Sequence, residues 1–224
     1  MTSDFSEHRL KMVDSQLRTT DVTSIVVQDA MLKVPREAFV PARRRELAYI
    51  DEDILVGGDE VSGTARYLME PSPFGKLLQL ADIRASDFVL VIGCATGYSA
   101  AVVCEIAGSV IALESDAALA EQATSTLSWL GCDTVAVVQG PLESGYPSEA
   151  PYDVVLFDGS VDRVPRAIFD QLRDGGRLAV VEGQGLAGVA RLYIKEGGVV
   201  APRRGFNAAV KPLPGFREEP AFEF

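Results

Sequence analysis

The stretch FVLVIGCATGYSAAVV (88–103) decides the fold. Its first part, FVLVIG (88–93), is an apolar run of strand length that ends in glycine, and the residues from Ser99 to Ile106 follow as a compact helical stretch rich in alanine and valine. A near-continuous apolar run bounded by a turn is typical of a strand buried on both faces of a parallel sheet. The stretch therefore predicts a strand, a tight turn and a helix, with the turn at the carboxyl edge of the sheet, where α/β folds bind ligands.

The same alternation of strand and helix continues to the end of the chain. The apolar and turn patterns predict strands over 109–113, 134–138, 152–157 and 177–181, helices over 116–130 and 165–172, and a hairpin of 191–195 with 199–202. Strands that alternate with helices imply parallel crossover connections. We therefore expect an α/β sheet over residues 81–224.

Residues 1–80 have a different, mainly helical pattern. Leu10, Val13 and Leu17 share one helical face, and a second helix is expected to begin after Thr20 or Asp21. Residues 56–73 contain glycines, acids and prolines and are expected to form a long ordered loop or lid before a short helix over 74–80. At 224 residues, of which 47% are hydrophobic, the chain is expected to be a single domain, 1–224, with a helical N-terminal part.

Composition excludes several classes of function. A formal net charge of −11 has the wrong sign for a protein that binds nucleic acid by neutralising phosphates. The single histidine, His8, provides no base for a Ser-His-Asp site and no set of ligands for a metal. The three cysteines have no CxxC spacing, and no apolar run has the length of a membrane span. We expect a cytoplasmic protein with no bound metal, no membrane contact and no nucleic-acid partner.

The glycine turn favours a nucleoside cofactor smaller than a dinucleotide. A dinucleotide fingerprint has glycine at its first, third and sixth positions, whereas this turn has Gly93, Ala95 and Tyr98. A phosphate-binding P-loop is excluded because no Lys-Ser or Lys-Thr pair follows Gly97. The alternative is a tight turn between strand and helix that holds no ligand.

Glu114 strengthens the interpretation of the turn as a cofactor site. It closes the strand that follows, 21 residues after Gly93, where an acid in such folds accepts hydrogen bonds from ribose hydroxyls. The alternative role for Glu114 is that of an acidic residue at the N-terminus of the next helix.

Several motifs resemble those of the protein-L-isoaspartate O-methyltransferase family. They are MVDSQLR (12–18), VQDAMLKVPREAFVP (27–41), AYIDEDIL (48–55), VLVIGCATGYSAAVV (89–103), PYDVVLFDGSVDRVP (151–165) and QLRDGGRLAVVEG (171–183). The resemblance implies a Rossmann-like, seven-strand methyltransferase fold with a helical N-terminal extension. It also implies S-adenosylmethionine as cofactor and, as substrate, proteins or peptides with isoaspartyl residues, whose carboxylates are methylated in the repair of damaged proteins.

The resemblance also implies a set of cofactor-binding residues. The cofactor motifs depart from the family pattern in three places. The set is Gly93, Cys94, Ala95, Thr96, Gly97, Glu114, Ser115, Gly140, Pro141, Leu142 and Asp158. The departures are Val91 where the family has an acid, Ala95 where it has glycine, and Gly140-Pro141-Leu142 where it has Gly-Asp-Gly. For Asp158 the alternative is a cap at the end of a strand.

The substrate loop is the fourth departure. The family writes this loop Gly-Gln-Thr-Ile-Ser-Gln-Pro, with the serine beside the reacting carboxylate. Counting forward from Ala48-Tyr49 pairs that serine with Ser62, whereas counting back from Gly93 pairs it with Met69. We take Ser62 as the candidate catalytic residue, with ordinary turn chemistry as the alternative.

Methyl transfer to a carboxylate suits a chain with so few titratable candidates, since the acceptor is already ionised at neutral pH and needs no general base. The first hypothesis is therefore an S-adenosylmethionine-dependent O-methyltransferase of the isoaspartyl family. Two alternatives stay open. One is a non-catalytic member that binds a nucleoside ligand or a protein partner, and the other is a methyltransferase with a different small-molecule acceptor. The sequence does not specify an oligomeric state.

Overall fold

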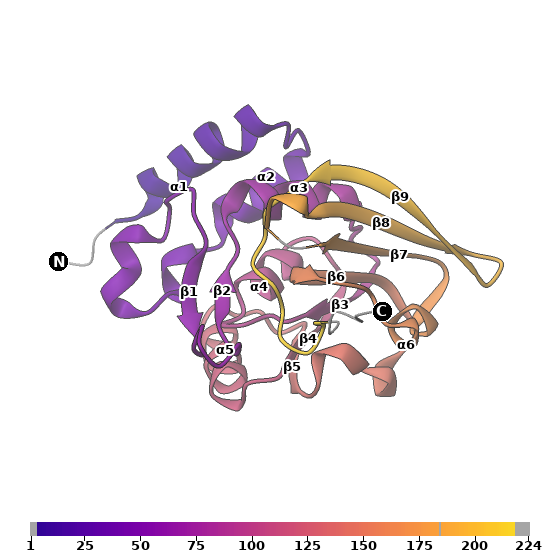
Figure 1. The fold of residues 1–224 in the computed structure, drawn as a ribbon. Helices are drawn as coiled ribbons and strands as arrows, with labels where there is room; N and C mark the ends of the chain where they lie inside the picture. The colour runs from indigo at the N-terminus through magenta and orange to yellow at the C-terminus, as the bar shows by residue number, and fades with distance from the viewer. Residues whose placement is uncertain (1–3, 184, 218–224) are drawn as a thin grey trace.

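The computed structural model describes residues 4–183 and 185–217, and its centre is a seven-stranded sheet (Figure 1). The strands lie in the order β5-β4-β3-β6-β7-β8-β9. Strands β3 to β7 pair in parallel, whereas β7, β8 and β9 pair antiparallel. Their bounds are β3 Phe88–Ile92, β4 Ser109–Glu114, β5 Val135–Gln139, β6 Tyr152–Val161, β7 Leu172–Glu182, β8 Val189–Glu196 and β9 Val199–Asn207. The strand order reverses at β3, which therefore marks the position where open α/β sheets bind ligands.

Strand β3 is buried on both faces, as its apolar run predicts. Val89 and Val91 belong to the core under the helical layer of α3 (Pro71–Ala81), α4 (Tyr98–Cys104) and α5 (Ala117–Trp129). Leu90 and Ile92 belong to a second core on the opposite face, which α6 (Arg166–Asp170) helps to cover. Side chains alternate along a strand, so these four residues tie both layers to the central strand.

Local signals fix the starts of the two helices next to the central strands. Helix α5 begins after Asp116, whose Oδ1 accepts hydrogen bonds from the backbone N–H groups of Ala118 and Leu119 at 2.8 and 3.0 Å. Helix α4 begins after Gly97, which has φ +98° and where a Cβ atom would lie 3.1 Å from the Cβ of Ala123. A residue with a side chain would be strained and crowded at position 97.

The N-terminal part is helical, but two details differ from the sequence-based expectation. After α1 (Ser6–Met12) the helix continues as a π-helical turn, Val13–Leu17, so that Met12 is buried whereas Leu10 is 47% exposed. Helix α2 (Ile25–Lys33) begins several residues later than expected because Ser24 caps it. Short 3-10 turns lie at Arg18–Thr20, Arg36–Phe39, Ala42–Leu47, Leu142–Ser144, Pro147–Glu149 and Gly185–Ala187.

Much of the segment expected to be a loop or lid forms a β-hairpin. Strands β1 (Ile54–Gly57) and β2 (Arg66–Leu68) pair antiparallel, and helix α3 begins soon afterwards at Pro71. The expectation of a continuous loop over 56–73 was therefore wrong. The turn between the strands carries the glycines and acids that suggested a loop, whereas the strands themselves are short and alternate between buried and half-buried residues.

Residues 208–217 follow β9 and form a strap across the carboxyl ends of the central strands (Figure 1). Three hydrogen bonds hold the strap to Ser160 of β6. The Ser160 N–H donates to the Lys211 carbonyl at 2.9 Å, the Ser160 hydroxyl to the Val210 carbonyl at 2.9 Å, and the Leu213 N–H to the Ser160 carbonyl at 2.8 Å. Within residues 4–183 and 185–217 no helix is both long and apolar enough to cross a lipid bilayer.

Candidate functional site

The glycine turn lies at the carboxyl end of β3, between the ends of β4 and β6. The N–H groups of Gly93 and Cys94 both donate to the Leu113 carbonyl of β4, at 2.8 and 3.1 Å. Gly93 has φ +81°, Ala95 has φ +48° and Gly97 has φ +98°, so the turn uses left-handed backbone three times, once at a residue with a side chain. This backbone turns sharply toward β4 and brings the turn against Glu114.

The Glu114 carboxylate is fully buried and accepts hydrogen bonds from the backbone around it. Its Oε2 accepts from the N–H of Ala95 at 2.8 Å. Its Oε1 accepts from the N–H groups of Ser115 and Asp116, at 2.8 and 3.1 Å, and from the Ser115 hydroxyl at 3.2 Å. Glu114 thus lies where the sequence places it, at the end of the strand that neighbours the turn.

Arg66 of the hairpin forms a buried ion pair with Glu114. Its Nη2 and Nε lie 3.0 and 3.3 Å from Oε2 of Glu114, and Nη2 also donates to the Gly93 carbonyl at 2.5 Å. The two side chains are 3% and 0% exposed. A charge this deeply buried requires a partner, and here the partner is the carboxylate that was expected to bind ribose.

Leu213 of the strap covers the glycines of the site. A Cβ atom added at Gly93 or at Gly159 would lie 2.7 Å from Cδ2 of Leu213, so the Leu213 side chain packs directly against both backbones. Leu213 itself is only 2% exposed. Because Gly93 and Gly159 have no side chains, a ligand could in principle approach their backbones closely. In this structure the Leu213 side chain occupies that space.

Asp158 lies in β6 on the other side of the turn and is 6% exposed. Burial raises the pKa of its carboxyl group to about 6, and the Ser99 hydroxyl and the guanidinium groups of Arg66 and Arg36 oppose that rise. Asp158 lines a cavity of about 10 Å³ enclosed by the hairpin, β6 and the strap, with Asp53, Arg66, Tyr67, Met69, Gly159, Val210, Lys211 and Pro212. This volume is about that of a single water molecule.

The other residues expected to bind cofactor lie in different surroundings: beside Glu114, in the protein interior, or at the surface. Gly140 lies beside Glu114, because its N–H donates to the Glu114 carbonyl at 3.0 Å, and Ser115 is adjacent. The side chains of Cys94, Thr96 and Leu142 are buried in the protein interior, where the Thr96 hydroxyl donates to the Phe39 carbonyl at 2.6 Å. Burial also raises the pKa of the Cys94 thiol. Pro141 is exposed.

Ser62 lies at the exposed tip of the hairpin. Its hydroxyl bonds to the Asp59 carbonyl at 3.1 Å and to the Thr64 hydroxyl at 2.8 Å, which is the turn chemistry considered as its alternative role. Met69 is buried at the end of β2, and its carbonyl accepts from Nη2 of Arg36 at 2.8 Å. The catalytic role of Ser62 stays a prediction.

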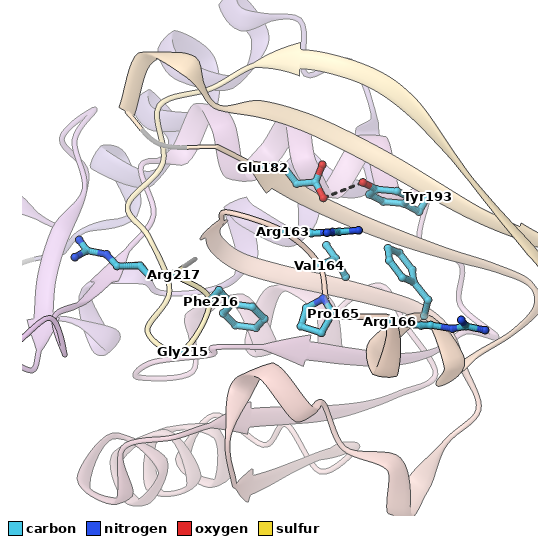
Figure 2. A pocket seen from close by; sticks show the side chains of 10 residues that line it. Arg163, Val164, Pro165, Arg166, Glu182, Tyr193, Gly215, Phe216 and Arg217 are labelled. Atoms are coloured by element: carbon cyan, nitrogen blue, oxygen red, sulfur yellow. Dashed lines mark hydrogen bonds between the residues drawn. The ribbon is translucent and has the colours of Figure 1, made fainter. Parts of the chain in front are cut away.

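A wider cavity has no residue of the glycine turn in its lining. It has a volume of about 600 Å³ and is lined by Arg163, Val164, Pro165, Arg166, Phe169, Glu182, Tyr193, Gly215, Phe216 and Arg217. The Tyr193 hydroxyl donates to Glu182 at 2.8 Å, and the side chains of Arg166 and Arg217 point away from one another (Figure 2). Arg166 and Arg217 therefore do not converge on one point of the cavity (Figure 2).

Comparison with known proteins assigns the chain to a family. The sequence model described as "Protein-L-isoaspartate(D-aspartate) O-methyltransferase (PCMT)" matches residues 7–204. The chain belongs to this family. It is 35% identical over 181 residues to "Protein-L-isoaspartate O-methyltransferase 1" of Rhodopseudomonas palustris (strain HaA2), which is 81% of this chain and 71% of the relative. It is 32% identical over 216 residues to "Protein-L-isoaspartate O-methyltransferase 2" of Archaeoglobus fulgidus, which is 95% of each chain.

Solved structures agree with the fold. A protein-L-isoaspartate O-methyltransferase superposes with a TM-score of 0.81 at 27% identity, over 92% of this chain and 66% of that one. The corresponding putative enzyme from Plasmodium falciparum, solved in complex with S-adenosyl-L-homocysteine, has a TM-score of 0.76 at 16% identity, over 92% of this chain and 97% of that one. The Rossmann-like methyltransferase fold expected from the sequence is thereby confirmed.

The cleft as described does not fit the cofactor that the family implies. Ligand pockets have volumes of roughly 300–1,000 Å³, whereas the cavity beside Asp158 measures about 10 Å³. Arg66 and Leu213 occupy the space between the turn, Glu114 and Gly159.

Sequence reasoning missed both of these side chains. The signal that could have found Arg66 is a charged residue in the short apolar run RYLM (66–69), but Leu213 has no such signal.

Proposed function

We propose that this chain is an S-adenosylmethionine-dependent O-methyltransferase that acts on isoaspartyl carboxylates of proteins or peptides. The proposal is carried by the turn Gly93–Gly97 beside Glu114 at the point where the strand order reverses, in a chain that the family matches over residues 7–204. Because the cleft is filled in the conformation described here, we propose that the activity requires a form in which Arg66 and the strap have moved.

The chemistry of the acceptor supports this class of reaction. A carboxylate is ionised at neutral pH, so the reaction depends on positioning and desolvation and not on a general base. The only histidine, His8, lies on the N-terminal helix α1, where its ring is near those of Phe5 and Tyr49 and not beside the glycine turn. The three cysteines are free thiols, which is typical of a reducing compartment, and we propose that the protein acts in the cytoplasm.

The test is transfer of a labelled methyl group from S-adenosylmethionine to an isoaspartyl peptide. The control is the same peptide with a normal aspartyl residue, and label above that control is the expected result. Label on neither peptide, from a protein that binds the cofactor, would contradict the isoaspartyl assignment and favour a different small-molecule acceptor.

The Arg66–Glu114 ion pair favours a second candidate function, a family member that uses the fold without the cofactor. Calorimetry with S-adenosylmethionine separates the two candidates. Heat of binding at submillimolar cofactor supports the methyltransferase. The second candidate is supported if no heat of binding is measured at millimolar cofactor, either for the wild type or for variants in which Arg66 or Leu213 is replaced.

A further inference from the structure

We infer that the side chains of Arg66 and Leu213 form an internal plug of the cofactor cleft, so that a nucleoside cofactor reaches Gly93 and Glu114 only after both have left. The inference rests on the proposed function, because it takes the glycine turn to be a cofactor site.

The first argument is the saturation of Glu114. An ionised carboxylate offers about four lone-pair directions to donors. In this structure Oε2 accepts from Nε and Nη2 of Arg66 and from the Ala95 N–H, while Oε1 accepts from the N–H and hydroxyl of Ser115 and the N–H of Asp116. No direction is left for the hydroxyls of a ribose. Removal of Arg66 takes away two of the three donors to Oε2, while the Ala95 N–H and the other backbone donors keep the carboxylate in place.

The second argument is the loss of space along the turn. The Gly93 carbonyl is already bonded to Nη2 of Arg66, and Leu213 lies against Gly93 and Gly159. The hairpin and the strap, which are far apart in sequence, therefore each place one side chain in the same cleft. A cofactor needs both to move, since each covers a different part of the turn.

The third argument concerns the residue at position 66. The Arg66 guanidinium both pairs with Glu114 and donates to the Gly93 carbonyl, so the charge and the length of this side chain close the cleft. A glutamine at this position is shorter and uncharged, so it has no charge for Glu114 to neutralise. Arg66→Gln is therefore the substitution that removes the plug with the least change of shape.

The attachments of the plug lie outside the strand pairing of the seven-stranded sheet. The described part of the strap is held by its hydrogen bonds with Ser160, by the Ala208 N–H, which donates to the Gly188 carbonyl at 3.0 Å, and by Phe216, whose ring lies 5.5 Å from that of Phe157 of β6. The β1–β2 hairpin forms a two-stranded sheet of its own. At the hairpin tip Val61 is 96% exposed, so the hairpin end is not packed against another element. Both segments lie outside the ladder of the seven-stranded sheet.

The experiment is calorimetric titration with S-adenosylhomocysteine of the wild type, Arg66→Gln and a matched control, Arg177→Gln. Arg177 of β7 forms a largely buried ion pair with Asp87, with side chains 13% and 7% exposed, away from the turn, so its loss tests the general effect of breaking such a pair. We expect Arg66→Gln to bind at least about tenfold more tightly than the wild type, which corresponds to an open fraction of no more than about a tenth in the wild type. Arg177→Gln should bind like the wild type.

Equal affinity of the wild type and Arg66→Gln would overturn the inference, and so would an absence of binding by both. Should Arg66→Gln fail to fold, Leu213→Ala carries the test, because it keeps the ion pair and uncovers the glycines; unchanged affinity would then overturn the inference. Hydrogen exchange adds a direct readout, since saturating ligand should reduce protection of the Leu213 N–H.

Failure of the plug and failure of the proposed function give different results. If Arg66→Gln gains binding of S-adenosylhomocysteine but labels no peptide, the plug stands and the methyltransferase assignment fails. If the wild type already binds as tightly as Arg66→Gln, the plug fails whether or not methyl transfer is found.

Discussion

At the scale of single residues, the buried pair of Arg66 and Glu114 is the most consequential contact of the site. Desolvation makes a buried ion pair of uncertain net benefit, but removal of one partner leaves the other charge buried and uncompensated. The backbone donors around Glu114 compensate part of that charge. The pair therefore fixes the hairpin to the glycine turn more than it contributes net stability.

We predict that Arg66→Met lowers the free energy of unfolding by about 3 kcal/mol, the lower end of the range for breaking a buried pair. The measurement is urea denaturation at neutral pH. Arg84→Met is the control, because the Arg84–Asp82 pair is exposed and such pairs contribute about 0–1 kcal/mol. A loss below about 1 kcal/mol for Arg66→Met, no larger than the control, would contradict the prediction.

Asp158 makes stability depend on pH. Its pKa in the folded protein is about 6, above the value of about 3.9 for an unfolded aspartate, so the folded state holds its proton to higher pH. The contribution of Asp158 to the free energy of unfolding is therefore constant below about pH 4. It falls as the pH rises from about 4 to about 6, and it stays at the lower value above about pH 6.

We predict that Asp158→Asn removes this dependence. The stability of the variant relative to the wild type should increase by about 2 kcal/mol between pH 4 and pH 7, because the folded pKa of about 6 lies above the unfolded value of about 3.9. Urea denaturation of both proteins across this range measures it. If the free energies of unfolding of the two proteins differ by the same amount at every pH, the ionisation of Asp158 does not destabilise the folded protein.

At the scale of elements, sequence periodicity predicted what depends on local pattern. The apolar run 88–93, the cap at Asp116 and the alternation of strands and helices predicted β3, α5 and the parallel part of the sheet. The prediction that Leu10, Val13 and Leu17 share one helical face was wrong for Leu10, which is 47% exposed, because the π-helical turn after Met12 changes the helical period. The loop expected over 56–73 was wrong for a related reason, since strands as short as β1 and β2 leave almost no periodic signal.

The site was only partly predictable because its parts meet through long-range contacts. Gly93 and Glu114 sit at the ends of predicted strands, so their proximity follows from the parallel sheet. The contacts of Arg66 with Glu114 and of Leu213 with Gly93 join segments with no pattern in common, the hairpin and the strap. Such pairings depend on packing and charge between segments that are distant in sequence.

We predict that Leu213→Ala destabilises the protein by about 2–4 kcal/mol, as expected for truncation of a buried leucine. Leu186→Ala is the matched control, because Leu186 is 97% exposed and its truncation should change stability by no more than about 0.5 kcal/mol. Chemical denaturation of both variants measures the difference. Equal stability of the two would mean that the strap is not packed on the turn in solution.

At the scale of the whole molecule, the charge distribution leads us to predict that nucleic acid is not a partner. The net charge of −11 opposes approach to phosphates, and the basic residues Arg43 to Arg45 and Arg203-Arg204 are too few to reverse it. We predict no retardation of a DNA duplex in a gel-shift assay at physiological salt. Retardation that weakens steeply with added salt would contradict this prediction.

The position of the cavity between Phe216 and Tyr193 has a consequence for inhibition kinetics. The cavity is lined by Gly215, Phe216 and Arg217, which follow Leu213 in the strap, and its lining does not include the glycine turn. A compound that bound between Phe216 and Tyr193 would hold the strap in place without occupying the space of the cofactor. Because the compound would bind only the closed form and the cofactor only the open form, each would exclude the other, and the inhibition would be competitive with cofactor although the two sites do not overlap.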